Sequence, residues 1–450
     1  MTSETFRFLQ PFKLNLLSHS KITIMKKVKI LIVISFLILA GCETNFDNEN
    51  SPTEDQVLST PNGLTGLIVG IQSQYTLGGA SGLYTSVTAS GLSTGELRVL
   101  NAGNADIAQI SNGGTNIAPS NAVITNLWTN TVLMRNNAEK LIAGSESISE
   151  PEFSKGVRVF GLFYRALAIS VTAQFWESLP VETGTAQSFV SRAEALSQAS
   201  SNVDEALSLL GGAGLPATIT AKTGTNINMN NSLRALSARI NIMLGNYDKA
   251  LSMATSVDLS SKSVFLFNAV SQNPIFRSSL TTNNVYDVNA DFGLIGSLAP
   301  NPSDERIPFY LTANAANGKG FFKSDSESIP VYLPGEMLLI KAEALAKTNQ
   351  LTLAVDELNK VLTKTAAQDA FGLGANLPAY TGPMTQDAIL TEIYRNRAIE
   401  LYMTGMKLED SRRFNRPGPN DANKERTRNF YPYPNSERDS NPNTPPDPAI

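Results

Sequence analysis

The chain has very little of two residue types that carry much of catalysis and metal binding. Its 450 residues include one histidine, His19, and one cysteine, Cys42. The part beyond Cys42 therefore cannot form a Ser-His-Asp or Cys-His relay, and it cannot assemble a zinc site from His and Cys ligands. It cannot form an internal disulfide either, so its stability has to come from packing. Carboxylate chemistry and calcium binding remain open.

Positive charge is also scarce in most of the chain. Six Lys or Arg and one Glu precede Cys42, which leaves 30 basic and 39 acidic residues from there to Ile450. The basic residues form no block, and nucleic-acid binding needs clustered positive charge, so we expect no nucleic-acid partner. The sequence also lacks a glycine-rich loop of the phosphate-binding kind. We therefore expect no cofactor.

The segment before Cys42 has the pattern of a secretory signal peptide. Lys26, Lys27 and Lys29 lead into the apolar run 30–40, which is too short for the roughly 20 residues of a membrane-spanning helix. The last four residues, LAGC, resemble the lipobox of bacterial lipoproteins. In that family the cysteine sulfur receives a diacylglyceryl group, the preceding peptide is cut off, and the new amino terminus is acylated. The alternative is a buried free cysteine after an ordinary signal peptide.

These features divide the chain into three expected parts. Residues 1–41 are an upstream extension and a lipoprotein signal peptide, with Met25 as the expected start. Residues 42–56 are polar and acidic and predict a flexible tether, since such a composition buries too little apolar surface to fold. Acidic residues directly after the cysteine make this segment resemble the one that follows the cysteine in surface-exposed lipoproteins of Bacteroidetes. The alternative is an ordinary solvated linker. Residues 57–450 are expected to form one domain.

Apolar residues recur at helical spacing through most of this domain, which predicts a mainly α-helical fold. The expected helices cover 60–74, 122–143, 152–177, 191–210 and 385–404. Segments 233–256 and 337–362 have the pattern of tetratricopeptide-like helical hairpins. Small residues such as Ala250, Ala342 and Ala354 stand where paired helices approach closely.

Two segments lack a helical period. Residues 76–120 are rich in Gly, Ser, Thr and Asn, and residues 268–330 mix Pro, Asn, Gly and Phe within a long insertion between the hairpins. We read both as irregular loops on the ligand side of the molecule, because binding residues are frequent in such loops.

An ordered set of segments resembles the SusD/RagB-like lipoproteins. It includes LWTNTVLMRNNAEKLI, FWESLPV, DERIPFY, VYLPGEMLLIKAEAL followed by AVDELNKVL, and RAIELYMTGMKLEDSRRF, all in the family's order. One departure is Asn396-Arg397, where the family often has Glu-Arg. The resemblance implies a right-handed superhelical scaffold of tetratricopeptide-like hairpins with a loop-rich insertion. It also implies a surface-exposed outer-membrane lipoprotein that captures a glycan or peptide for a SusC-like TonB-dependent transporter and is not an enzyme.

Glycan binders stack sugar rings on aromatic side chains and bind hydroxyl groups with polar ones. By location the candidate ligand-binding residues are Tyr84, Glu96 and Arg98 in the first loop segment, and Phe309, Tyr310 and Phe321 in the insertion. The alternative for each is a core or hinge role. Trp176 ends an apolar helix, and we expect it to be structural.

Two other functions compete with nutrient capture. A tetratricopeptide-like assembly or scaffold lipoprotein that binds proteins would explain the repeats but not the insertion. A glycosidase would need two carboxylates facing each other across a bond, and the neighbours Asp304 and Glu305 fit a capped turn beside Arg306 better. We therefore expect no catalytic residue, and we identified no metal ligand.

Overall fold

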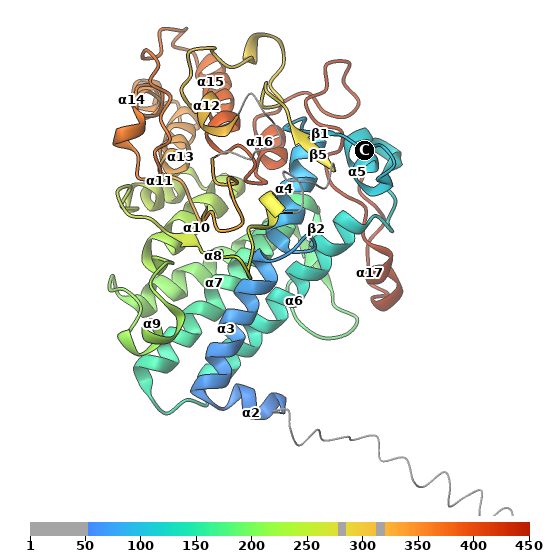
Figure 1. The fold of residues 1–450 in the computed structure, drawn as a ribbon, viewed down its shortest axis with the longest axis vertical. Helices are drawn as coiled ribbons and strands as arrows, with labels where there is room; N and C mark the ends of the chain where they lie inside the picture. The colour runs from blue at the N-terminus through green and yellow to red at the C-terminus, as the bar shows by residue number, and fades with distance from the viewer. Residues whose placement is uncertain (1–52, 278–284, 312–319) are drawn as a thin grey trace, which may run out of the picture. The chain divides into compact units, whose positions relative to one another are not determined.

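Side chains that can cap a helix mark where several helices begin. The computed structural model describes residues 53–277, 285–311 and 320–450, and the chain from Asp55 onward forms one compact unit (Figure 1). The side-chain oxygens of Thr60, Ser81, Asn121 and Ser191 accept hydrogen bonds from amides in the first turns of α3, α4, α6 and α8. Such a cap satisfies amides that the helix itself leaves free. Cys42 and the expected signal peptide lie outside the described residues.

Long helices with wide apolar faces form the first part of the unit, as the periodicity predicts. They are α3 (Pro61–Thr76), α6 (Ala122–Ser145), α7 (Pro151–Phe175) and α8 (Arg192–Leu210). Helix α7 packs between α6 and α8. Among the described residues α7 alone is long and apolar enough to cross a membrane, but 89% of its most apolar window is buried inside the fold. It is therefore a core helix of this protein.

The expected helical hairpins are both present. The first consists of α10 (Met229–Leu244) and α11 (Tyr247–Thr255), and the second of α13 (Pro334–Lys347) and α14 (Leu351–Leu362). Helix α11 contacts α13, so the second hairpin stacks on the first although about 80 residues separate them in sequence. Ala250, Ala342 and Ala354 are completely buried at these helix contacts. Helices α15 (Gln386–Glu400) and α16 (Lys407–Arg413) continue the stack.

The prediction for residues 76–120 was wrong. This segment contains α4 (Gly82–Ser93), β1 (Leu97–Val99) and α5 (Ala105–Asn112). Every residue of α4 is buried, and the helix contacts α3, α5, α6, α16 and β1. A helix enclosed on all sides needs no polar face, so its sequence shows no amphipathic period. The run of small and uncharged residues reflects burial rather than a loop.

The insertion between the hairpins is irregular where it is described, as expected. Its longest regular piece is the five-residue helix α12 (Arg306–Tyr310). Within the described ranges, three two-stranded antiparallel ladders fasten loops to the body: β1 with β5 (Tyr286–Val288), β2 (Ser178–Pro180) with β3 (Phe189–Ser191), and β4 (Val264–Phe265) with β6 (Ile329–Pro330). The first ladder brings Arg98 opposite Asp287, which joins the insertion to the segment after α4.

The remaining elements are short. They are α2 (Glu54–Leu58), α9 (Ala217–Thr223), α17 (Asn435–Ser440) and the 3-10 turns Gly114–Asn116, Gly296–Leu298 and Ala366–Gln368. Helix α2 begins inside the segment expected to be a tether. Helix α15 ends at Glu400 rather than at residue 404, because Met403 has a left-handed backbone conformation (φ 57°) that a helix cannot contain.

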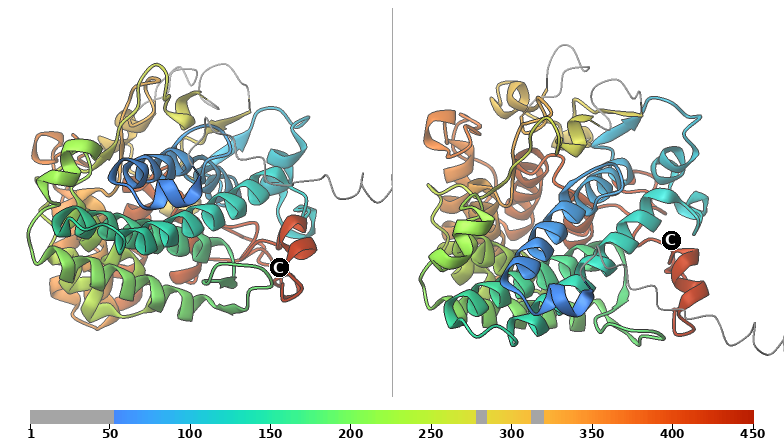
Figure 2. Two further views of the ribbon diagram at one scale, coloured as in Figure 1. Left: turned by 90° about the horizontal axis from the view of Figure 1, so that it is seen from below. Right: turned by 60° about the horizontal axis from the view of Figure 1, so that its bottom comes forward.

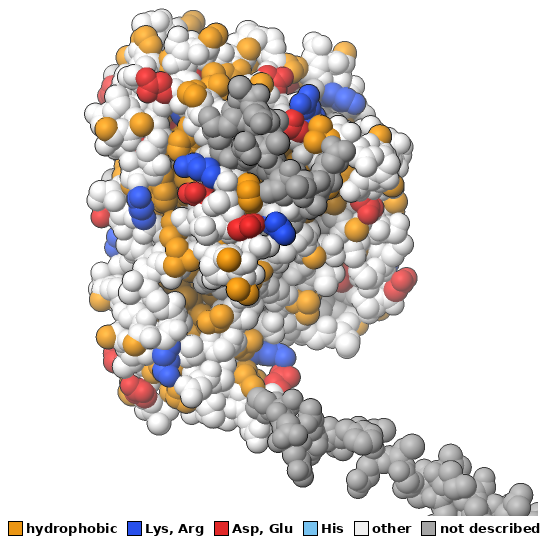
Figure 3. All heavy atoms as spheres, viewed as in Figure 1, with side chains coloured by type: hydrophobic (Ala, Val, Ile, Leu, Met, Phe, Trp, Pro, Cys, Tyr) orange, Lys and Arg blue, Asp and Glu red, His pale blue; other side chains and the backbone are white. Residues whose placement is uncertain are grey.

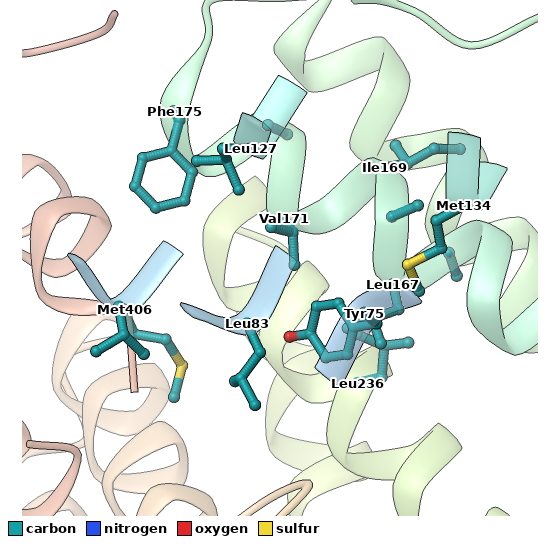
Figure 4. Close-up of a cluster of buried hydrophobic side chains, with 14 of the residues drawn as sticks. Tyr75, Leu83, Leu127, Met134, Leu167, Ile169, Val171, Phe175, Leu236 and Met406 are labelled. Atoms are coloured by element: carbon teal, nitrogen blue, oxygen red, sulfur yellow. The ribbon is translucent and has the colours of Figure 1, made fainter. Parts of the chain in front are cut away.

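The main core lies where the first helices meet α10 and the turn before α16. Figure 4 shows side chains from α3, α4, α6, α7 and α10 converging there with Met406, including Tyr75, Leu83, Leu127, Leu167 and Leu236. The two further views show that the loops of the insertion lie together on one side of these helices (Figure 2). The helical body thus forms a rigid base for that loop-rich side.

Candidate functional site

Three predicted site residues of the insertion meet in one aromatic cluster. The ring centres of Phe309 and Tyr310 lie 4.9 Å apart, and those of Phe309 and Phe321 lie 5.5 Å apart. A fourth ring, Phe371, packs edge-on against Phe321 at 5.8 Å. Edge-to-face contacts of this kind are favourable beyond the area that they bury. We refer to Phe309, Tyr310, Phe321 and Phe371 as the aromatic cluster.

The members of the aromatic cluster differ in exposure. Tyr310 and Phe321 are buried, at 4% and 7% relative exposure, whereas Phe309 and Phe371 are half-buried. The ammonium of Lys262 lies 5.5 Å from the centre of the Phe371 ring, which places a hydrogen-bond donor beside it. Phe309 and Phe371 are therefore the rings that can offer surface to a ligand, and Tyr310 and Phe321 support them from below.

Close packing holds the cluster in place. The hydroxyl of Tyr310 donates a hydrogen bond to the backbone oxygen of Glu400 at 2.9 Å. Gly320 has a left-handed backbone (φ 61°), and a Cβ there would lie 2.9 Å from Tyr310 and 3.1 Å from Phe309. The insertion therefore approaches the two rings at a point where only glycine fits.

A buried ion-pair network lies behind the cluster. Arg306 forms ion pairs with Asp304 at 2.7 Å and with Glu400 at 3.0 Å, and Lys364 pairs with Glu400 at 3.0 Å. Burial alone would raise the pKa of Glu400, but Lys364 and Arg306 hold that pKa below its ordinary value. Glu400 is therefore ionised at neutral pH, and the network fixes α12, which carries Phe309 and Tyr310, to the end of α15.

Asp304 and Glu305 do not form a catalytic pair. The Asp304 carboxylate is buried and bound by the Arg306 guanidinium, while Glu305 is exposed and accepts a hydrogen bond from Asn376 at 2.7 Å. No group of three or more His, Cys, Asp or Glu side chains that could hold a metal ion occurs among the described residues.

A narrow crevice lies beneath the loop-rich side. It has a volume of about 70 Å³ and is lined by Phe321 and Phe322, by Tyr75 and by the ion pair between Arg239 and Glu336, among other residues. One water molecule takes up roughly 30 Å³ in the liquid, so the crevice holds a few waters and no sugar ring.

The comparisons with known proteins agree on one fold. A family model described as the SusD family matches residues 312–447. A SusD homolog from Bacteroides thetaiotaomicron superposes with a TM-score of 0.66 at 12% identity, over 90% of this chain and all of that one. A putative sugar-binding protein from Bacteroides vulgatus superposes with a TM-score of 0.63 at 15% identity, and the match covers 86% of this chain and 98% of that one. A SusD-like carbohydrate-binding protein from Bacteroides fragilis superposes with a TM-score of 0.62 at 14% identity, and the match covers 86% of this chain and 99% of that one. No curated protein matches.

The chain thus has the fold of SusD superfamily proteins, and its residues 312–447 match the SusD family. Its mainly α-helical fold with stacked hairpins and a loop-rich insertion is the fold that the sequence resemblance implied.

The other predicted site residues lie apart from the aromatic cluster. Tyr84 is buried in α4 and stacks on Tyr286 at 6.3 Å. Arg98 is largely exposed and pairs with Asp287 at 2.7 Å. Glu96 is buried behind Tyr402, whose ring lies 5.5 Å from Tyr310 and whose hydroxyl donates to the Glu96 backbone oxygen. Tyr84 and Glu96 thus occupy core positions, the alternative considered for them.

Sequence reasoning missed Phe371 and Lys262. Phe371 stands in a stretch of Gly, Ala and Asn between two predicted helices, the same kind of context that singled out the insertion. The composition around Phe371 could therefore have identified it as a candidate in this shorter loop. Trp176 is fully buried, and its indole nitrogen donates to the backbone oxygen of Pro432, which agrees with a structural role.

Proposed function

We propose that this SusD/RagB-like protein is a surface lipoprotein that captures a glycan or oligosaccharide and passes it to a SusC-like TonB-dependent outer-membrane transporter. In this proposal Cys42 carries the lipid that anchors the chain in the outer membrane. The protein binds its ligand and does not cleave it.

The observation that carries the proposal is the pair of half-buried rings, Phe309 and Phe371, on a supported aromatic cluster. A sugar ring has an apolar C–H face and a polar rim, so it pairs well with a fixed aromatic surface beside donors such as Lys262. Two of the structurally similar proteins are described as sugar- or carbohydrate-binding, which supports a carbohydrate as the ligand class.

The surface charge fits a neutral ligand. On the described parts of the face drawn in Figure 3, acidic and basic side chains are interspersed and no basic patch appears. A tetratricopeptide-like scaffold that binds proteins would use the hairpins alone, and it would leave the aromatic cluster of the insertion without a role.

A glycan array with the full chain in detergent would identify the ligand, and isothermal titration would then measure its affinity. Phe309→Ala and Phe371→Ala should each weaken binding by about tenfold, the effect of losing one stacking contact. Phe189→Ala is a matched control, since Phe189 is also half-buried but belongs to the cluster around Trp128. Circular dichroism checks that each variant folds.

If Phe309→Ala and Phe371→Ala bind like the parent while the array shows a clear ligand, the aromatic cluster is not the binding surface. If the array shows no glycan and a peptide library shows binding, the ligand class is wrong. Delivery is tested separately by co-purification of a TonB-dependent transporter with the anchored chain from its own membrane.

A further inference from the structure

A second hollow lies beside the start of α12, between α15 and the loop that follows the second hairpin. Its volume is about 260 Å³, several times the roughly 30 Å³ of one water molecule. The turn before α12, the loop 377–382 and helix α15 enclose it, and its lining shares no residue with the aromatic cluster. We call it the α15 pocket.

The polar wall of the α15 pocket comes from Arg306 and from Glu392, Arg395 and Asn396 of α15. Asn396 donates to the carboxylate of Glu392 at 2.8 Å and accepts from Arg306 at 2.8 Å. Arg395 donates to Glu392 at 3.3 Å and to the backbone oxygen of Ala299 at 3.0 Å. These bonds fix the side chains before any ligand arrives.

The same bonds decide which ligand charge suits the pocket. Among the side chains that line the pocket, Arg306 pairs with Asp304 and Arg395 pairs with Glu392. The lining therefore carries two basic and two acidic side chains and no net charge that would attract an ion. Glu392 and Arg395 keep 20% and 23% side-chain exposure, so this pair of an acceptor and a donor side chain remains partly open to solvent. This combination suits hydroxyl groups, each of which donates and accepts.

The opposite wall is apolar and equally fixed. It consists of Leu362, Leu377, Pro378 and Tyr380. The backbone amide of Tyr380 donates to Asn359 at 2.7 Å and its hydroxyl donates to the backbone oxygen of Pro383 at 3.0 Å. The side chain of Tyr380 folds back over Gly382, where a Cβ would lie 2.5 Å from the Tyr380 hydroxyl oxygen and 2.6 Å from the nearest ring carbon. Tyr380 is therefore held against the loop by contacts that need glycine at this position.

We propose that the α15 pocket is a second sugar-binding site, which takes one neutral pyranose ring between the Tyr380 wall and the hydroxyl-binding side chains Glu392 and Arg395. One ring matches the size of the hollow, and a fixed aromatic wall facing a charge-balanced polar wall matches the two faces of a sugar. The inference rests on the proposed carbohydrate capture but assigns a separate site to it. A glycan end held here would be bound independently of the rings Phe309 and Phe371.

The test uses the full chain in detergent and a panel of neutral monosaccharides, glucose, galactose and mannose, observed by saturation-transfer NMR and titration. Tyr380→Ala and Glu392→Gln should each weaken binding of the preferred monosaccharide by about tenfold. Tyr380→Phe, which keeps the ring, should retain binding, and so should Leu353→Ala, because Leu353 is exposed on α14 and does not line the pocket. Phe309→Ala should leave monosaccharide binding at this pocket intact.

The outcomes separate this inference from the proposed function. If Phe309→Ala abolishes all sugar binding while Tyr380→Ala and Glu392→Gln have no effect, the second site does not exist and the proposed function stands. If none of the three monosaccharides binds to the parent, the second site fails, whereas the proposed function is decided by the glycan array. If a free amino acid binds and depends on Tyr380 while sugars do not, the pocket is real but the neutral-sugar assignment is wrong.

Discussion

Glu96 is a buried carboxylate whose ionisation should make the stability of this protein depend on pH. Its relative exposure is 1%, and among the described residues neither of its carboxylate oxygens has a hydrogen bond of ordinary geometry. Burial raises the pKa of Glu96 to about 7; Lys407 and the backbone amide of Met403 offset part of that rise. The amide's contact falls short of a hydrogen bond, but its dipole still favours the charged form.

The direction in which stability changes with pH follows from the pKa of Glu96 in the folded and the unfolded chain. Unfolded, Glu96 ionises near its ordinary pKa of 4.5; folded, it holds its proton until about pH 7. Its contribution to stability is therefore fully present below pH 4.5 and is lost as the pH rises through 7. A difference of this size corresponds to about 3 kcal/mol. Burial lowers the pKa of Lys407 to about 8, so the lysine stays charged across this window and adds no slope there.

The test is urea unfolding of the parent and of Glu96→Gln at several pH values between 5 and 7. The parent should lose about 2 to 3 kcal/mol more than the variant over this range, because Gln has no proton to release. Glu182→Gln, on an exposed residue, controls for the loss of one carboxylate in general. Parallel curves for the parent and Glu96→Gln would refute the reasoning, since they would mean that Glu96 is ionised throughout.

Two further predictions concern the anchor and the hairpin scaffold. Cys42→Ser should abolish lipid labelling and leave an uncleaved or soluble chain, and normal palmitate labelling of the variant in the membrane fraction would contradict a lipid at this position. Ala342→Arg should destabilise the fold by a few kcal/mol, because it forces a charged side chain into a completely buried helix contact, and an unchanged melting temperature would show that the contact is misassigned.

The sequence predicted the helices that have a polar face, such as α8, but it did not predict α4, which has none. Helix α8 was expected at 191–210 and occupies Arg192–Leu210, and the hairpin helices were also correct to within a few residues. Helix α4 was missed because it is buried on every side, and its polar members are serines and threonines. Thr85 in α4 and Thr94 directly after it donate their hydroxyls to backbone oxygens one turn earlier, at 2.7 and 2.8 Å. Composition alone could not distinguish this helix from a loop.

The sequence grouped only some of the candidate site residues as the structure places them. Aromatic residues outside a helical period were expected to face a ligand, and the expectation brought together Phe309, Tyr310 and Phe321, which do form one cluster. The sequence does not show how deeply each aromatic side chain is buried, however, and Tyr310 and Phe321 prove to be buried. Whether a ring supports a surface or forms it depends on neighbours from distant segments, such as Gly320 above it and Glu400 behind it.

The short helix α12 explains how scaffold and loop-rich side are joined. Both of its ends are fastened to Glu400, the last residue of α15: Arg306 binds the Glu400 carboxylate, and the Tyr310 hydroxyl binds the Glu400 backbone oxygen. One side of α12 thus contributes Arg306 to the α15 pocket, and its end presents Phe309 in the aromatic cluster. Two proposed binding surfaces therefore depend on one buried carboxylate. Buried ion pairs of this kind stabilise little in net terms, but they fix geometry, which is the property that a binding surface requires.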